Sequence, residues 1–230
     1  MRKEVKVLFG TLFVCVIILA TCIFSMNARS QAFTIEVRDH LLERINIIEG
    51  QVPKNAEYYL LAKQLQERAG DNLTGFEIRE IAGEIMLQCE LNSDIGLTPA
   101  RVLAVIERES GFRPDVVSHM NAYGLMQCLE ATFAVHLPHL GYPLPTKELM
   151  LDPITNVRVG MRELVRLKRM WIANGYENRD DWKITFYSYY AGETWARRLL
   201  TTLEKGTFPG LEYGIGTEKL AREWSERGVS

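Results

Sequence analysis

Residues 99–127 read P-A-R-V-L-A-V-I-E-R-E-S-G-F-R-P-D-V-V-S-H-M-N-A-Y-G-L-M-Q. Thr98 stands directly before Pro99, and a threonine cap followed by proline at the first helical position is typical of a helix start. At about 100° per residue, the apolar side chains of this helix share one arc, formed by Val102, Leu103, Val105 and Ile106. The stretch therefore predicts a helix that buries one face against a core and ends before Gly111.

Glu109 falls inside this apolar arc, four residues after Val105 and three after Ile106. A carboxylate on an apolar face is costly unless it is neutralised or hydrogen-bonded, and the dipole at the last turn of a helix also disfavours negative charge. Both effects favour the protonated acid, which is how a glutamate becomes a general acid near neutral pH. Taken alone, this geometry favours a structural role, an acid at the rim of the core beside a helix end.

Residues 109–127 resemble the signature of the soluble-lytic-transglycosylase (SLT) type of peptidoglycan lyases, E-S-x-F-x-P-x-A-x-S-x-x-G-A-x-G-L-M-Q. The departures are Val116, where alanine is usual, and Asn121, where glycine is usual. Asparagine tolerates a left-handed backbone better than most residues. Ten residues match at fixed offsets: Glu109, Ser110, Phe112, Pro114, Ser118, Ala122, Gly124, Leu125, Met126 and Gln127.

Two later stretches extend the resemblance, which covers about residues 96–200. N-V-R-V-G-M-R-E-L at residues 156–164 is similar to a helix of the family with Asn and Gly at this spacing. S-Y-Y-A-G at residues 188–192 is similar to the family's A-Y-N-A-G element, but Ser188 replaces alanine and Tyr190 replaces asparagine. The replacement at Tyr190 bears on substrate positioning or activity.

The resemblance implies a mainly α (α+β, lysozyme-like) fold with a cleft for a glycan strand, and Glu109 as the single catalytic residue. In the implied reaction, Glu109 protonates the glycosidic oxygen between N-acetylmuramic acid and N-acetylglucosamine. Its anion then takes the proton of the muramoyl C6 hydroxyl, whose oxygen closes on C1 to give a 1,6-anhydro end. The reaction consumes no water, and the resemblance implies no cofactor and no metal ion.

Three further residues are expected to bind substrate by the same resemblance. Gln127 matches a glutamine that contacts the sugar near the cleavage point, although it could also be a polar residue at a helix start. Tyr189 matches a tyrosine whose hydroxyl lies near the acid, and the alternative is core packing among neighbouring aromatic residues. Ser118 matches a serine that shapes the cleft, with capping of a backbone turn as the alternative.

Two other classes of function stay open. A hydrolytic muramidase on the same fold would need a positioned water and a second polar base. A glycan-binding scaffold would keep the cleft without turnover, and Tyr190 together with the unmatched N-terminal helices is compatible with it. A zinc pair at His136 and His139 is disfavoured, because Pro138 prevents a regular helix and no acid or thiol spacing supports it.

The N-terminal segment predicts a membrane anchor. Arg2, Lys3 and Lys6 precede twenty uncharged residues, 7–26, which would span about 30 Å as a helix. The flanking positive charges predict a cytoplasmic N-terminus, a single pass through the bacterial inner membrane and an exported remainder. A cleaved signal peptide and lipidation at Cys22 are the alternatives.

The charge balance limits the partners. The net charge of −2, with no basic run beyond the first segment, argues against a nucleic-acid ligand. The expected partners are peptidoglycan glycan strands, the membrane and possible envelope-spanning or cell-wall machinery. In an oxidising compartment Cys89 and Cys128 could form a disulfide, and two buried free thiols are the alternative.

Helical periodicity and capping signals run through most of the remaining chain. A capping box at Thr74 to Glu77 opens one helix. Further helices are predicted over residues 33–48, 56–69, 153–174, 181–190, 193–204 and 217–227, and loops over 141–146 and 206–216. We expect three parts: residues 1–26 as cytoplasmic tip and anchor, 27–91 as a helical stalk or accessory region, and 92–230 as a lysozyme-like transglycosylase domain.

Overall fold

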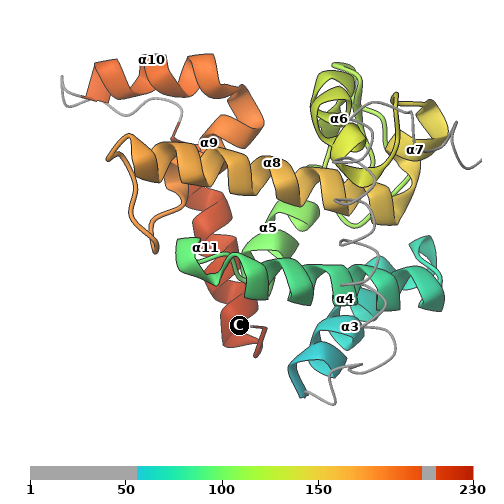
Figure 1. Ribbon diagram of the computed structural model, residues 1–230. Helices are drawn as coiled ribbons and strands as arrows, with labels where there is room; N and C mark the ends of the chain where they lie inside the picture. The colour runs from blue at the N-terminus through green and yellow to red at the C-terminus, as the bar shows by residue number, and fades with distance from the viewer. Residues whose placement is uncertain (1–55, 204–210, 230) are drawn as a thin grey trace, which may run out of the picture. The chain divides into compact units, whose positions relative to one another are not determined.

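The computed structural model describes residues 56–203 and 211–229, and these are mainly α-helical (Figure 1). Two strands of two residues each, β1 (Ala122–Tyr123) and β2 (Cys128–Leu129), form an antiparallel hairpin in which Ala122 lies opposite Leu129. The mainly α class is thus confirmed, while the lysozyme-like assignment stays a prediction. In chain order the helices are α3 (Ala56–Ala69), α4 (Gly75–Leu91), α5 (Pro99–Ser110), α6 (Glu130–His136), α7 (Lys147–Leu151), α8 (Pro153–Ala173), α9 (Lys183–Ala191), α10 (Glu193–Leu203) and α11 (Glu212–Glu226).

Side-chain caps start α4 and α5 where the sequence predicts them. The Thr74 hydroxyl accepts the Glu77 N–H at 3.2 Å, and the Glu77 carboxylate accepts the Thr74 N–H at 2.7 Å, which completes the capping box. The Thr98 hydroxyl accepts the Arg101 N–H at the start of α5, and Pro99 occupies its first turn. These bonds satisfy backbone donors that a helix start leaves unpaired.

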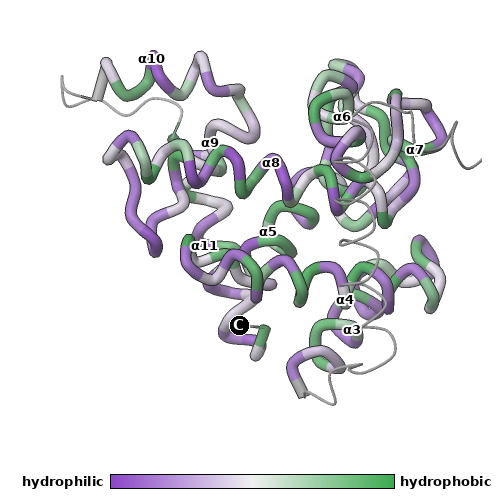
Figure 2. The backbone as a smooth tube through the Cα atoms, in the orientation of Figure 1, coloured by the Kyte–Doolittle hydropathy of each residue, from purple (hydrophilic) through white to green (hydrophobic). Residues whose placement is uncertain are grey.

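Helix α5, the first part of the 99–127 stretch, lies within the core. It packs against α4 and α11, while α8 contacts α4, α6, α7 and α9 (Figure 1). One hydrophobic cluster runs from α3 through α5 and α8 to α11, so the described part of the 27–91 stretch shares its core with the rest. Along α4 and α8, hydrophobic and hydrophilic residues alternate as expected for amphipathic helices with one buried side (Figure 2).

A buried ion pair fixes the start of α9, the helix that carries Tyr189 and Tyr190. The Glu177 carboxylate accepts the backbone N–H groups of Ile184 at 2.7 Å and Thr185 at 3.1 Å. Lys168 on α8 neutralises this carboxylate at 3.2 Å, and neither side chain is exposed. The pair therefore links the first turn of α9 to α8, and removing one member would leave an uncompensated buried charge.

The C-terminal helix corrects one prediction. Helix α11 begins at Glu212, five residues before the predicted start, so residues 212–216 are helical and not loop. The glycines there suggested a loop, but an added Cβ at Gly214 would collide with the Lys183 carbonyl oxygen of α9. Close approach of two helices, and not a turn, explains this glycine. The predicted loop over 141–146 is confirmed, while α6, α7 and the hairpin were not predicted.

Two predictions concern the thiols and the membrane segment. Cys89 on α4 and Cys128 on β2 are both buried and both free, as in the second of the two alternatives. The predicted anchor at 7–26 and the predicted helix over 33–48 lie outside the described residues. Within 56–203 and 211–229, no helix is both long and apolar enough to cross a bilayer.

Candidate active site

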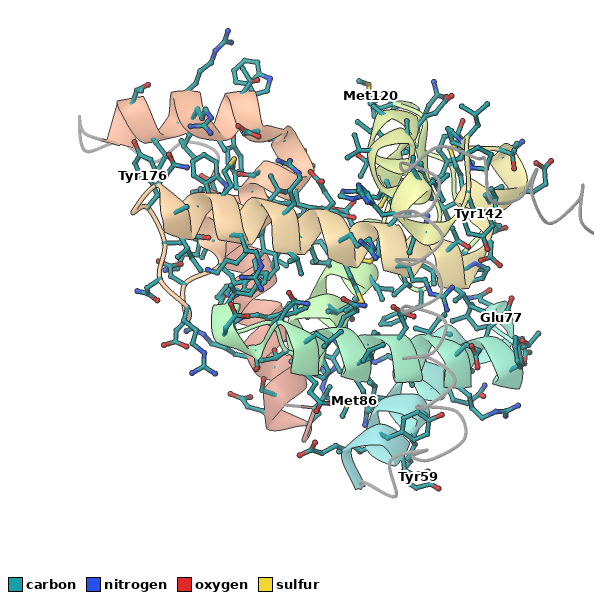
Figure 3. The ribbon with its side chains drawn as sticks, in the orientation of Figure 1. Tyr59, Glu77, Met86, Met120, Tyr142 and Tyr176 are labelled. Carbon is teal, nitrogen blue, oxygen red and sulfur yellow. The ribbon has the colours of Figure 1, made fainter. Side chains whose placement is uncertain are left out.

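A cavity of about 740 Å³ opens between the end of α5, the hairpin region, α8 and the α9–α10 corner. It is lined by all four residues singled out from the sequence, Glu109, Ser118, Gln127 and Tyr189. Met120, labelled in Figure 3, lines the same cavity with its side chain largely exposed. The fold therefore gathers the predicted catalytic and substrate-binding residues around one space.

Glu109 sits at the last turn of α5 and is half-buried. The Tyr213 hydroxyl of α11 donates a hydrogen bond to its carboxylate oxygen Oε1. Burial raises the pKa of Glu109 above its ordinary value, and the Tyr213 bond and the Arg108 charge oppose this rise without cancelling it. The carboxyl is thus biased toward the protonated form while its anion keeps one hydrogen-bond donor, as an acid that later serves as a base requires.

Gln127 and Ser118 are both tied to the backbone of the loop that contains them. The Gln127 amide donates to the carbonyl oxygens of Val116 at 3.0 Å and Gly124 at 2.9 Å. Both of its N–H groups are used there, so its carbonyl oxygen is the atom left for a ligand. The Ser118 hydroxyl accepts the N–H groups of Met120 and Ala122 at 3.3 and 3.0 Å, which is the capping role considered above.

Tyr189 of α9 contacts the backbone and side chain of residues next to Gln127. Its hydroxyl donates to the Met126 carbonyl at 2.8 Å and lies 3.2 Å from the Cys128 sulfur. Burial raises the pKa of Tyr189 well above its ordinary value, and burial raises the pKa of the Cys128 thiol to about 12, so both stay protonated near neutral pH. Tyr189 is therefore both a wall of the cavity and a support for the loop before Gln127.

Within residues 109–127 the backbone takes conformations that non-glycine residues seldom adopt. Among the described residues, the non-glycine positions with left-handed φ are Phe112 at 63°, Asn121 at 56° and Gln127 at 49°. All three lie within residues 109–127. Left-handed backbone at asparagine was expected, whereas at phenylalanine and glutamine it signals strain of the kind that clusters at functional sites.

Two further carboxylates line the cavity, and both are ion-paired. Glu163 of α8 accepts hydrogen bonds from Arg166 at 2.7 and 2.9 Å and is 2.9 Å from His136 Nε2. Burial pushes the pKa of Glu163 up, but the bonds from Arg166 and His136 outweigh burial and hold it below its ordinary value. Glu193 accepts a bond from Arg197 at 2.9 Å and lies 3.6 Å from Arg166. Glu109 is thus the cavity carboxyl with a raised pKa.

The family model of the Transglycosylase SLT domain matches residues 90–205, half of the chain. The chain belongs to this family. The matched range contains Glu109, Ser118, Gln127 and Tyr189, whereas Tyr213 lies beyond its end.

Curated relatives of this chain are named as lytic murein transglycosylases. The membrane-bound lytic murein transglycosylase C of Mannheimia succiniciproducens is 27% identical over 168 residues, covering 67% of this chain and 46% of the relative. Its namesake from Klebsiella pneumoniae is 29% identical over 99 residues, 42% of this chain and 27% of the relative. The chain thus spans less than half the length of these relatives. The 70 kDa soluble lytic transglycosylase of Escherichia coli aligns with a TM-score of 0.46 at 18% identity, over 76% of this chain and 32% of that one.

Asn156 and Gly160 of α8 position the segment of the SLT domain that ends at Gln127. The buried Asn156 amide accepts the Met126 N–H at 2.8 Å and donates to the carbonyls of Tyr123 at 2.7 Å and Met150 at 2.9 Å. One turn later, an added Cβ at Gly160 would lie 2.8 Å from the Met126 Cβ, too close for any side chain. This spacing, noted in the sequence, therefore positions the segment that ends in Gln127.

Tyr213 and the two further cavity carboxylates, Glu163 and Glu193, were missed from the sequence. Tyr213 was placed in a predicted loop, although Tyr213, Thr217, Leu220 and Trp224 repeat at helical spacing and could have revealed that α11 begins before residue 217. Glu163 lies on a helix that was predicted, but nothing in its spacing points to a cavity. His136, one of the two histidines of the disfavoured zinc pair, is hydrogen-bonded to Glu163.

Proposed function

We propose that this chain is a lytic transglycosylase that cleaves the β-1,4 bond between N-acetylmuramic acid and N-acetylglucosamine in peptidoglycan. The observation that supports it most is Glu109, a half-buried carboxyl with a raised pKa at the wall of a cavity lined by the SLT motif. Membership of the SLT family and the names of the murein transglycosylases it resembles support the same reaction. Because the chain spans less than half of those relatives, the activity and substrate are proposals.

In the proposed reaction Glu109 acts twice. Its proton passes to the glycosidic oxygen as the bond to C1 of the muramoyl sugar breaks, and positive charge builds up at that carbon. The Tyr213 hydroxyl, hydrogen-bonded to the carboxylate, stabilises the anion that results. The anion then accepts the proton of the C6 hydroxyl while the C6 oxygen bonds to C1, which regenerates the acid.

The supporting residues receive matching roles. The free carbonyl oxygen of Gln127 accepts an N–H or O–H of the sugar, since its amide N–H groups are already bound. Tyr189 and Ser118 hold the loop and the turn that shape the cleft. These roles are carried over from the family and from the contacts above.

Hydrolysis on the same scaffold is the second candidate. It needs a carboxylate that activates water, and Glu163 and Glu193 are the further carboxylates that line the cavity. Both Glu163 oxygens accept bonds from Arg166 or His136, and Glu193 is paired with Arg197 and Arg166. Neither carboxylate is free to act as a base, which favours transglycosylation.

The test is the mass of fragments released from purified peptidoglycan by the full-length chain in detergent. We expect fragments lighter by one water molecule than the hydrolytic products, with 1,6-anhydro ends. Fragments with free reducing ends would establish a muramidase instead. Binding of glycan without any released fragment would favour the scaffold.

The pH dependence gives a second prediction. Because the first step needs protonated Glu109, the rate falls as pH rises through the raised pKa of this residue. Tyr213→Phe removes the bond that opposes this rise, so the alkaline limb of the profile moves to higher pH. The same change lowers kcat by about 10- to 100-fold, because the carboxylate anion loses a hydrogen-bond donor.

Steady-state kinetics on soluble glycan strands across the pH range measure both effects. Phenylalanine keeps the ring that contacts Arg108, whose guanidinium lies 4.2 Å from the Tyr213 centroid, so only the hydroxyl is removed. Tyr176→Phe is the control, since Tyr176, labelled in Figure 3, is not one of the residues that line the cavity. An unchanged profile for Tyr213→Phe would contradict the role of Tyr213.

We also propose that residues 7–26 anchor the chain in the inner membrane, with residues 27–91 as stalk or accessory region and residues 92–230 as the enzyme outside the cytoplasm. The support is the sequence pattern of basic residues before twenty uncharged ones and the membrane-bound relatives. An anchored enzyme reaches only nearby wall, which suits local opening for an envelope-spanning machine.

A further inference from the structure

Tyr190 is the cavity residue at which this chain departs most from the family pattern. It stands near the end of α9 where asparagine is usual, lines the cavity and is 63% exposed. Its ring stacks on the Tyr213 ring with centroids 4.3 Å apart and planes 8° from parallel. An asparagine has no ring and cannot make this contact.

The Tyr213 side chain depends on such contacts for its direction. Its backbone is anchored in α11, where the Thr217 hydroxyl donates to the Tyr213 carbonyl at 2.8 Å. A fixed backbone still allows the side chain more than one rotamer. The ring is contacted by Tyr190 and by the Arg108 guanidinium, 4.2 Å from its centroid, and the hydroxyl donates to Glu109. Stacking therefore selects the rotamer in which the hydroxyl reaches the carboxylate.

We propose that Tyr190 is a positioning residue for Glu109, acting through Tyr213: its stacked ring holds the Tyr213 hydroxyl on the carboxylate. The inference extends the proposed function, on which its kinetic consequence rests. Removal of the Tyr190 ring frees Tyr213 to rotate, and Glu109 then loses part of a hydrogen bond that stabilises its anion. Tyr190 itself takes no part in proton transfer.

The carboxyl of Glu109 is the group to follow, and its surroundings define the expected direction. The groups that act on it or feel its charge are Arg108 of α5, Tyr213 of α11, Cys128 of β2 and Tyr189 of α9. Burial raises the pKa of the Cys128 thiol and of the Tyr189 hydroxyl and keeps both protonated. A change at Tyr190 therefore acts on Glu109 through Tyr213, and loosening that bond raises the pKa of Glu109.

The experiment is a titration of the ¹³C-labelled Glu109 carboxyl in the full-length chain by NMR, with the signal assigned by its absence in Glu109→Gln. Tyr190→Ala should raise the pKa of Glu109 in the direction that Tyr213→Phe does. In the double variant Tyr190→Ala/Tyr213→Phe, the pKa of Glu109 should equal its value in Tyr213→Phe alone, because both changes act on the same Tyr213–Glu109 hydrogen bond. Tyr190→Phe retains a stacking ring, so the pKa of Glu109 should be the same in this variant as in the unchanged chain.

Tyr59→Ala is the matched control. It removes another exposed tyrosine (59%) that packs on a neighbouring tyrosine, Tyr58, at 5.5 Å, but on α3, away from the cavity-lining Met120 (Figure 3). In parallel kinetics, Tyr190→Ala should lower kcat about 3- to 10-fold with little change in KM, a fraction of the loss caused by removing the hydroxyl itself. Melting temperatures verify that each variant is folded.

An unchanged Glu109 titration in folded Tyr190→Ala, or a Glu109 pKa in the double variant higher than in Tyr213→Phe alone, would overturn the inference. The titration requires no catalysis. A chain that releases no fragments but shows the shift would defeat the proposed function and leave the coupling intact. If the chain cleaves peptidoglycan but Tyr190→Ala leaves the pKa of Glu109 unchanged, the proposed function stands and the role of Tyr190 is overturned.

Discussion

Glu109→Gln lowers the rate of fragment release from peptidoglycan by about 10²- to 10⁴-fold, the range expected when a general acid–base group is lost. The amide cannot supply the proton that the glycosidic oxygen needs, nor accept the proton of the C6 hydroxyl. Its shape is nearly that of the acid, and its carbonyl oxygen can still accept the Tyr213 bond. The fold should therefore survive the change, and initial rates of fragment release, followed by liquid chromatography and mass spectrometry, measure the loss.

The control for this substitution is Glu90→Gln, which makes the same chemical change at an exposed position near the end of α4. It should leave both the rate and the products as they are in the unchanged chain. Cleavage by Glu109→Gln at more than about a tenth of the original rate would show that another group supplies the proton. Glu163 would then be the next carboxyl to replace.

Asn156→Leu lowers the free energy of unfolding by about 3 to 5 kcal/mol, the loss expected when a buried hydrogen-bond network is broken. The amide is fully buried and serves the Met126 N–H and the carbonyls of Tyr123 and Met150. Leucine has a similar size but leaves these three backbone groups without their partner. Urea denaturation followed by circular dichroism measures the change.

The same helix offers a control. Asn174 follows the last residue of α8 as its C-terminal cap, is exposed, and its side-chain amide donates to the Met170 carbonyl at 2.7 Å. Asn174→Leu should cost less than about 1 kcal/mol, because water can replace that bond. A second variant, Asn156→Asp, keeps the acceptor for Met126 but cannot donate to the two carbonyls, so it should also destabilise strongly. Near-equal stabilities for the Asn156 and Asn174 variants would show that this network does not hold the loop.

Much of the scaffold followed from local signals in the sequence. The caps at Thr74 and Thr98 satisfy the backbone N–H groups of the helices that they open, so they predicted α4 and α5 correctly. The apolar arc of α5 placed Glu109 on its inner side, and the structure finds it half-buried with a raised pKa. Each of these features depends on residues within a few positions of one another, and such interactions can be read along the chain.

The family motif supplied what periodicity could not. Geometry alone favoured a structural role for Glu109, whereas the ten matched residues pointed to a cleft and to Ser118 and Gln127, and the later S-Y-Y-A-G match pointed to Tyr189. The structure places these residues around one cavity. The departure at Tyr190 was visible in the sequence, but its stacking on Tyr213 was not.

Local sequence signals predicted the helices that begin with caps and the inward position of Glu109, and the family motif pointed to four of the residues that line the cavity. Tertiary structure alone decided the partner of the acid. The glycines around Tyr213 suggested a loop, and only the close approach of α11 to α9 shows that Gly214 is required for packing. It also decided that Glu163 enters the cavity paired with Arg166, and that Cys89 and Cys128 stay free. These outcomes depend on contacts between residues far apart in the chain, to which local propensity and spacing are blind.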